Sequence, residues 1–316
     1  MDTTKVFDRH EGARQLLFAV AVLLSLTPWV TPPVALVLGL VVALFIGHPF
    51  LHLNHKATHI LLQVSVVGLG FGMNAAAALK AGREGFIFTV ISILGTLLVG
   101  LSIGRFFKIE QKTSLLISGG TAICGGSAIA ALAPVIRAEE RQVSVALGVV
   151  FILNSVALFV FPVVGHWLGL SQVQFGLWSA IAIHDTSSVV GAAGRYGTEA
   201  LQIATTVKLA RALWIIPVSL VAALVFGGKG GKIKIPWFIG LFVVAILVNT
   251  WLPVPLVSHA IVGAAHAGLT LTLFLIGSGL SRQVLKNTGV KPLMQGVLLW
   301  VLISGAALWA VVSVVK

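Results

Sequence analysis

The sequence has few charged residues and only one cysteine. Charged side chains make up 9% of its 316 residues and hydrophobic ones 58%, whereas soluble domains carry about a quarter charged residues. This balance excludes a soluble globular protein and indicates a chain that crosses a membrane several times. The single cysteine, Cys124, excludes an intrachain disulfide.

Several functional motifs are also absent. The sequence contains no phosphate-binding loop, nucleophile elbow or zinc motif, so we expect neither an ATP-driven pump nor an enzyme, and no cofactor. The net charge of +12 does not indicate a nucleic-acid partner, because most Lys and Arg lie in short loops between apolar runs. His48, His52, His55 and His59 follow one face of a helix, but without a nearby cysteine or carboxylate an interfacial polar face is favoured over a metal site.

The apolar runs predict an all-α polytopic membrane protein with about 11 transmembrane helices, each able to cross about 30 Å. The runs fall at residues 15–30, 34–50, 58–79, 86–107, 113–136, 142–165, 173–194, 199–226, 236–252, 258–281 and 293–315. We interpret residues 1–316 as one integral membrane domain with halves at 34–170 and 171–316. Residues 1–33 then form an extra N-terminal helix, which lacks a clear cleavage site and is not read as a signal peptide.

The basic residues predict the orientation. If every run crosses the membrane, most of the 21 Lys and Arg residues, Lys112 among them, share the side of the N-terminus. Arg137 and Arg141 fall in the smaller set on the other side. The positive-inside rule then places the N-terminus in the cytoplasm and the C-terminus in the periplasm.

A weak internal echo indicates inverted repeats. VGLGFGMNAAAALKAG at 67–82 and FLIGSGLSRQVLKNTG at 274–289 share a Gly-x-Gly core and a Leu-Lys exit. The two spans run in opposite directions, as the halves of an inverted repeat do.

The most unusual stretch is GGTAICGGSAIAA, at residues 119–131, where two glycine pairs interrupt an apolar run. Lipid leaves freed backbone groups without partners, so a break at this depth is tolerated only beside protein or a wet cavity. We expect the break at Gly125 and Gly126. Ser127 would then cap the second half-helix and leave its positive end facing the gap.

A second unusual stretch begins at His184. Asp185 is the only acidic residue deep in an apolar run, and such a residue is a functional candidate by default. The hydroxyl residues that follow indicate a half-helix capped by Asp185 or Thr186. His184 and Asp185 could exchange protons with a substrate site; the alternative is a carboxylate that only caps a kink or pairs with a base.

The third constellation lies on the helix that follows. Thr198, Gln202, Thr205, Lys208 and Arg211 recur on one helical face. Two cations inside a membrane need an acid, a solvated cavity or an anion, and Asp185 can neutralise only one of them. The alternative is that both cations extend to the interface, although the apolar length on either side favours mid-depth placement.

These features together favour a small anionic solute as the partner, with Arg suited to bidentate contact and Lys to a point charge. Asn74 and Asn154 are interpreted as packing residues that hydrogen-bond between helices. Three other functions stay open: a cation/proton antiporter that titrates Asp185, a passive anion channel, and a membrane scaffold. The sequence leaves a homo-oligomer open as well.

GTAICGGSAIAALAPVI, HDTSSVVGAAGRYG and KLARALWIIPVSL resemble the YeiH-type family of bacterial inner-membrane proteins, whose members go by the name of sulfate exporters. The resemblance covers nearly the whole chain. It implies an inner-membrane location and export of a small oxyanion such as sulfate, sulfite or an organosulfonate. The family is distantly similar to the cation/proton antiporter and anion transporter superfamily, whose members have inverted repeats and two broken helices that cross at mid-membrane.

Carried over by motif, this similarity places the site at the two interrupted stretches. The expected substrate-binding residues are Thr121, Cys124, Gly125, Gly126, Ser127, Thr186, Ser187, Ser188, Lys208 and Arg211, with His184 and Asp185 in proton coupling. One conflict remains, because the runs at 113–136 and 173–194 would point the same way and repeats should be antiparallel. Either one segment is re-entrant, the span count is wrong by one, or the partner of 113–136 is 258–281.

Overall fold

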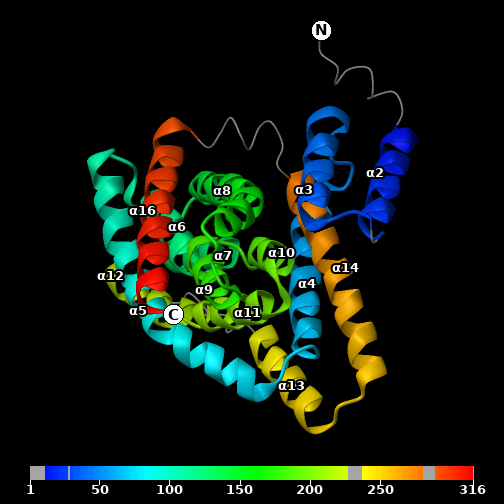
Figure 1. Cartoon of the computed structure of the whole chain (residues 1–316). Coiled ribbons are helices and arrows are strands. Elements are labelled where there is room, and N and C mark those ends of the chain that lie inside the picture. The colour runs from blue at the N-terminus through cyan, green and yellow to red at the C-terminus, as the bar shows by residue number, and fades with distance from the viewer. Residues whose placement is uncertain (1–10, 28, 227–236, 280–288, 316) are drawn as a thin grey trace. The chain divides into compact units, whose positions relative to one another are not determined.

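The computed structural model describes residues 11–27, 29–226, 237–279 and 289–315, and every regular element in these ranges is a helix (Figure 1). Within the described ranges, five helices are long and apolar enough to span a membrane: Ala78–Phe106, Arg141–Trp167, Thr198–Phe226, Pro255–Gly279 and Val290–Val314. Shorter apolar helices cover Pro32–Ile46, Gly126–Val135 and Gly240–Trp251. The prediction of an all-α polytopic membrane protein is therefore confirmed.

The contacts divide the chain into two compact units. Unit 1 contains residues 1–75 and 237–285, and unit 2 contains residues 76–236 and 286–316. This division follows contacts rather than repeats, so the predicted halves at 34–170 and 171–316 stay a prediction.

Unit 1 is built around one long helix. Its helices are α2 (Glu11–Ser25), α3 (Pro32–Val41) with the π-helical turn η1 (Val42–Ile46), α4 (Leu51–Gly70), α13 (Trp237–Trp251) and α14 (Pro255–Gly279). A Cβ at Gly39 would overlap the Phe274 carbonyl and one at Gly277 the Leu36 carbonyl, so α3 and α14 touch backbone to backbone.

Helices α4 and α14 are antiparallel. Asn54 Nδ2 donates to the Leu275 carbonyl at 3.0 Å, whereas Gly68, at the other end of α4, lies against Ala265. The opposite directions predicted for the two Gly-x-Gly spans are thereby confirmed, although residues 280–288 of the second lie outside the described residues. The side chains of His52, His55 and His59 also lie outside them.

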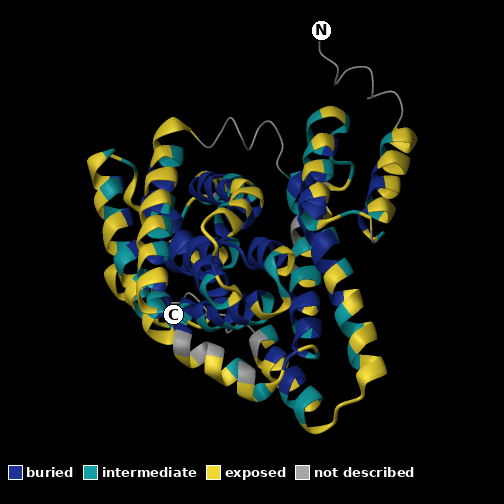
Figure 2. Ribbon diagram, viewed as in Figure 1, coloured by how far each residue is buried: buried dark blue, intermediate teal, exposed yellow. Residues whose placement is uncertain are grey.

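Unit 2 holds the two interrupted stretches. Its helices are α5 (Ala75–Phe106, its first residue in unit 1), α6 (Gln111–Ala122), α7 (Gly126–Val135), α8 (Glu140–Trp167), α9 (Gln172–Ala182), α10 (Thr186–Tyr196), α11 (Thr198–Ala212), α12 (Ile215–Phe226) and α16 (Val290–Val314). Figure 2 shows dark blue, buried residues on α6, α7, α9 and α10, whereas α5 and α16 expose long outer faces.

Helices α6 and α7 fold back on each other as a hairpin. Near its tip, a Cβ at Gly120 would lie 3.0 Å from Ile129, and near its base Lys112 Nζ donates to the Arg137 carbonyl at 2.7 Å. The run at 113–136 therefore returns to the end where it began, and its prediction as a full crossing is wrong. The reason is Gly125, which turns the chain at the tip with φ +69°.

Helices α9 and α10 form a second hairpin. The rings of Phe175, near the start of α9, and Tyr196, at the end of α10, stack with centroids 3.8 Å apart. The Tyr196 hydroxyl also donates to the Leu170 carbonyl at 2.5 Å, just before α9 begins. The run at 173–194 is therefore not a crossing either.

The two hairpins enter from opposite ends of α8. The first begins beside the α8 N-terminus, where Glu110 bonds Arg141 at 2.6 Å and Gln142 at 2.8 Å. The second has its base at the α8 C-terminus, where the ring of His166 stacks on Tyr196 at 4.3 Å. The 28 residues of α8 separate these bases by about 42 Å. The hairpins are thus antiparallel, which removes the conflict in direction.

The contacts of Glu110 make the base of the first hairpin sensitive to acid. The Gln142 amide, and then the Arg141 guanidinium, lower the pKa of the Glu110 carboxyl below its ordinary value. A lowered folded-state pKa contributes stability above the unfolded pKa, and that stability is lost as pH falls through the folded value. The pair is exposed, with side chains 70% and 50% accessible, so solvent screens the contribution.

The hairpin also corrects the placement of two basic residues. Arg137 and Arg141 lie at the same end of unit 2 as Lys112, not at the opposite end. With Arg105 and Lys108, at the end of α5, they form what we call the basic end of unit 2. The correction strengthens the charge asymmetry on which the orientation was predicted.

Single-cysteine labelling tests the hairpin topology. In a Cys124→Ser background, Lys112→Cys and Arg137→Cys should react with an impermeant thiol reagent from the same side of oriented vesicles. Arg195→Cys, at the base of the second hairpin, should react only from the other side. Labelling of positions 112 and 137 from opposite sides would contradict the hairpin.

Candidate functional site

The tips of the two hairpins meet. A Cβ at Gly125 would lie 3.3 Å from the His184 carbonyl oxygen and 3.4 Å from the Asp185 Cα. Its φ of +69° lies in the region that L side chains rarely adopt, so glycine suits both the turn and the close approach. Two stretches about 60 residues apart in the sequence are therefore joined at one point inside unit 2.

Asp185 caps the second half of its hairpin, as predicted. It is the N-cap of α10, and its Oδ2 accepts from the backbone N–H groups of Ser187 at 3.0 Å and Ser188 at 3.3 Å. The Ser187 hydroxyl donates to the same oxygen. Asp185 thus places a carboxylate at the positive end of the α10 dipole.

Ser127 does not cap α7, so that prediction is wrong. The N-cap is Gly125 and carries no side-chain bond, because Ser127 lies one residue inside the helix. The positive end of α7 therefore begins without a carboxylate, in contrast to α10.

Lys208 and Arg211 are both fully buried, with 0% of their surface exposed. Lys208 Nζ donates to the carbonyls of Ile183 at 2.6 Å and Ala180 at 3.3 Å, at the C-terminal end of α9. The proposal that the two cations extend to an interface is wrong, because each is directed at a helix end inside the unit.

Arg211 hydrogen-bonds to the first hairpin, which is formed by α6 and α7. Its Nη2 donates to the carbonyl of Ala122, the last residue of α6, and its Nη1 to Ser92 Oγ at 3.1 Å. The two cations thus satisfy orphan carbonyls at the negative ends of α6 and α9. Sequence reasoning considered an acid, a cavity or an anion as their partners and missed these helix ends.

Charges at the meeting point do not balance. Each helix end carries about half an elementary charge, and the negative ends of α6 and α9 offset the positive ends of α7 and α10. Among the side chains placed there by the structure, Lys208 and Arg211 are cationic and Asp185 is anionic. By this formal count about one positive charge is in excess, and the start of α7 is a positive helix end without a side-chain cap.

Asn154 lies in the middle of α8 and connects that helix to the tip of the second hairpin. Its Oδ1 accepts from the backbone N–H groups of His184 at 3.0 Å and Asp185 at 3.3 Å. Sequence reasoning interprets this residue as one that packs between helices, and it misses the link to the site. Its position midway along an apolar run was the available signal, because an amide there needs a partner.

Several buried polar atoms at the meeting point lack a partner among the residues that the structure describes. They are Thr121 Oγ1, Asn154 Nδ2, Arg211 Nε and both ring nitrogens of His184. Buried polar groups are nearly always hydrogen-bonded, and an unpaired one calls for a water, an ion or a ligand. Donors predominate in this set, which suits an acceptor-rich guest.

The structure therefore brings most of the predicted residues together. Cys124, Thr186, Ser187 and Ser188 are buried at the two tips, whereas Ser127 is half-buried. The Ser187 hydroxyl is occupied by Asp185, which leaves Thr121 as the buried hydroxyl without a partner in the described part of the first tip. The assignment of these residues to substrate binding stays a prediction.

Long apolar helices with two buried hairpins define a multi-pass, all-helical membrane protein. The chain belongs to the family described as conserved hypothetical protein 698, whose profile matches residues 14–296. It is 60% identical to a UPF0324 membrane protein of Bacteroides thetaiotaomicron over 87% of this chain and 84% of the relative. A UPF0324 membrane protein of Shewanella oneidensis is 48% identical over 98% of both chains.

A third relative, from Porphyromonas gingivalis, is 55% identical over 89% of this chain and 87% of its own, and carries the same UPF0324 name. No solved structure matches the chain. These names describe bacterial membrane proteins and no substrate, so sulfate export remains an implication of the motif resemblance.

Replacing Asn154 should destabilise the site. Asn154→Ala leaves the N–H groups of His184 and Asp185 unpaired in a buried position, at a cost of about 2 kcal/mol. We expect a clearly lower melting temperature for the purified protein in detergent. Ser155→Ala is the matched control, because that hydroxyl bonds the Phe151 carbonyl of its own helix. Equal melting temperatures for the two variants would contradict the role of Asn154.

Proposed function

We propose that the protein is a secondary transporter of a small oxyanion such as sulfate, sulfite or an organosulfonate, and that it works as an exporter. The observation that carries the proposal is the excess positive charge where the hairpin tips meet. Lys208 and Arg211 are fully buried beside one carboxylate, Asp185. A buried charge without a counter-charge is costly, and a bound anion removes that cost.

The first hairpin offers the most suitable position for the anion. The start of α7 has no side-chain cap, and Arg211 Nε and Thr121 Oγ1 lie at the same tip without partners in the described residues. Backbone N–H groups at a helix N-terminus bind anions, and arginine adds directed donors. In other transporters, half-helix N-termini near the bilayer midplane point at anionic substrate groups in the same way.

The arrangement favours a transporter over an open channel. Under this proposal the anion binds between two hairpins that enter from opposite ends, an arrangement that suits alternating access. Lys208 and Arg211 are inaccessible, whereas a permanently open anion pore would keep such cations in water.

Coupling and orientation extend the proposal. His184 and Asp185 would exchange protons with the site and couple export to the proton gradient. We place the basic end of unit 2 in the cytoplasm of the inner membrane by the positive-inside rule. The C-terminus then lies in the periplasm, because the Val315 carbonyl near the end of α16 accepts from Gln174 at the other end of the unit. A homo-oligomer remains compatible with the proposal.

The rival function is a cation/proton antiporter, which the buried Asp185 favours. Asp185→Asn separates the two, because asparagine can still accept from the Ser187 and Ser188 N–H groups and keep α10 capped. Under the anion proposal the variant loses the negative charge of Asp185 and should bind sulfate or sulfite more tightly, by about tenfold.

The measurement is a thermal-shift titration with sulfate, sulfite, thiosulfate, taurine and carboxylates at two pH values, with sodium and potassium chloride as controls. A ligand present at 100 times its Kd stabilises the folded state by about 2.7 kcal/mol. An anion should raise the melting temperature of the wild type and, at lower concentration, of Asp185→Asn. A shift that depends on sodium or potassium and disappears in Asp185→Asn would support the antiporter instead.

A further inference from the structure

A cavity at the basic end of unit 2 has the chemistry of a second anion site. We propose that it holds the oxyanion before the anion passes along α6 to the hairpin tips, and we call it the outer anion site. This inference rests on the proposed function and adds to it a second anion-binding position, at the basic end of unit 2.

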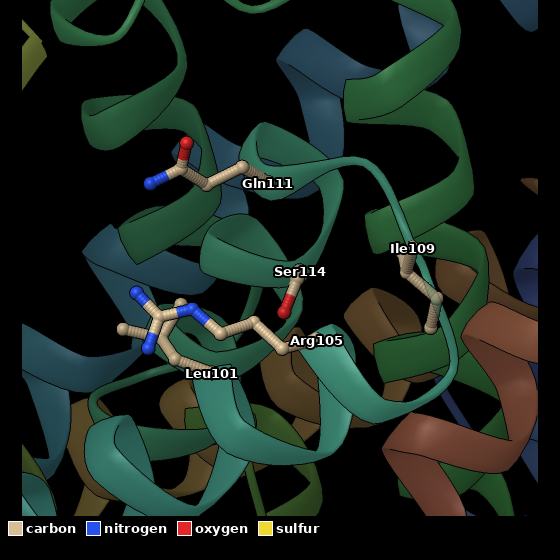
Figure 3. Close-up of a pocket in the computed structure, with 5 residues that line it drawn as sticks. All are labelled: Leu101, Arg105, Ile109, Gln111 and Ser114. Atoms are coloured by element: carbon tan, nitrogen blue, oxygen red, sulfur yellow. The ribbon is translucent and has the colours of Figure 1, made fainter.

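The cavity encloses about 240 Å³ and is lined by Leu101, Arg105, Ile109, Gln111 and Ser114. It lies between the end of α5 and the start of α6, with two apolar walls and three polar side chains (Figure 3). In this view the guanidinium of Arg105 and the amide of Gln111 extend in the same direction. A cationic and an amide donor beside apolar walls suit a small oxyanion with an organic or inorganic core.

The charge of Arg105 is not neutralised by the acidic residue of the adjoining loop. Glu110 directs one carboxylate oxygen to Arg141 at 2.6 Å and the other to Gln142 at 2.8 Å. Both oxygens are therefore engaged away from Arg105. The cavity keeps a positive character, which concentrates anions at its mouth.

Ser114 connects the cavity to the interior. Its hydroxyl oxygen accepts from Gln295 Nε2 at 2.8 Å, which leaves its proton available to donate to an anion. Ser118 and Thr121 follow on the same face of α6, at steps of four and three residues. The step from Ser114 to Thr121 is about 10 Å along the helix, and it ends at the unpartnered Thr121 hydroxyl of the first tip.

The polar face between the two positions is closed in this structure. A Cβ at Gly104 would overlap the Ser114 hydroxyl and one at Gly100 the Ser118 hydroxyl, so α5 lies directly on this face. Gln295 bridges the contact, because its Nε2 donates to the Gly100 carbonyl at 2.9 Å as well as to Ser114. Passage requires α5 and Gln295 to separate from α6.

Charge-selective labelling tests the outer anion site without relying on transport. The protein carries Cys124→Ser and Gln111→Cys, and the new thiol is treated with anionic sulfonatoethyl and cationic trimethylammonioethyl methanethiosulfonates. We expect the anionic reagent to react faster, inorganic sulfate to slow it, and Arg105→Gln to lower the anionic-to-cationic rate ratio about tenfold. Arg137→Gln is the matched control: that arginine lies at the same end of unit 2 but does not line the cavity, and its loss should leave the ratio within about twofold.

The outcomes separate this inference from the proposed function. A rate ratio indifferent to Arg105→Gln, or labelling indifferent to sulfate in a protein that transports sulfate, would overturn the outer anion site and leave the transporter standing. Protection by sulfate that is lost in Arg105→Gln supports the site. If such protection occurs in a protein that moves no anion across proteoliposomes, the site stands and the transporter proposal fails.

Discussion

Helix ends inside a membrane must find partners, and the rest of unit 2 depends on how this requirement is met. A hairpin that stops at mid-depth leaves carbonyls at the end of one helix and N–H groups at the start of the next, with no water to satisfy them. Lys208 supplies donors to the end of α9, and Arg211 supplies them to the end of α6. Both cations come from α11, so one helix supplies the donors that end the first helix of each hairpin. This explains why two cationic side chains with no exposed surface lie on one face of the same helix.

The same solution creates the functional asymmetry of the site. The carboxylate of Asp185 neutralises the positive end of α10. The start of α7 has no such carboxylate, so the meeting point of the hairpin tips keeps an excess of positive charge. A structural device would be expected to balance its charges, because an uncompensated buried charge costs several kcal/mol. The imbalance therefore favours a site completed by a mobile anion. The basic end extends this electrostatic preference to the surface, where Arg105 lines the cavity.

Much of this arrangement could be predicted from the sequence. Hydrophobic runs indicated an all-helical, multi-pass membrane protein. Gly125 and Asp185 marked the two interruptions, because a glycine pair and a carboxylate are both exceptional in an apolar segment. Direction could not be predicted: a run of 24 or 22 residues (113–136, 173–194) has the same composition whether it crosses or folds back. That ambiguity misplaced Arg137 and Arg141. The partners of Arg211 were also beyond prediction, because the Ala122 carbonyl carries no side-chain signal and becomes available only where the hairpin ends.

Location of a bound anion tests the central claim most directly. Selenate has the charge and shape of sulfate and scatters anomalously, so crystals of the protein grown with selenate report its position without ambiguity. The account predicts an anomalous selenate peak at the start of α7, within hydrogen-bond distance of backbone N–H groups and beside Arg211. A cation-binding site would not produce this peak. A rubidium peak at Asp185 in crystals grown with rubidium, with no selenate at the hairpin tips, would contradict it.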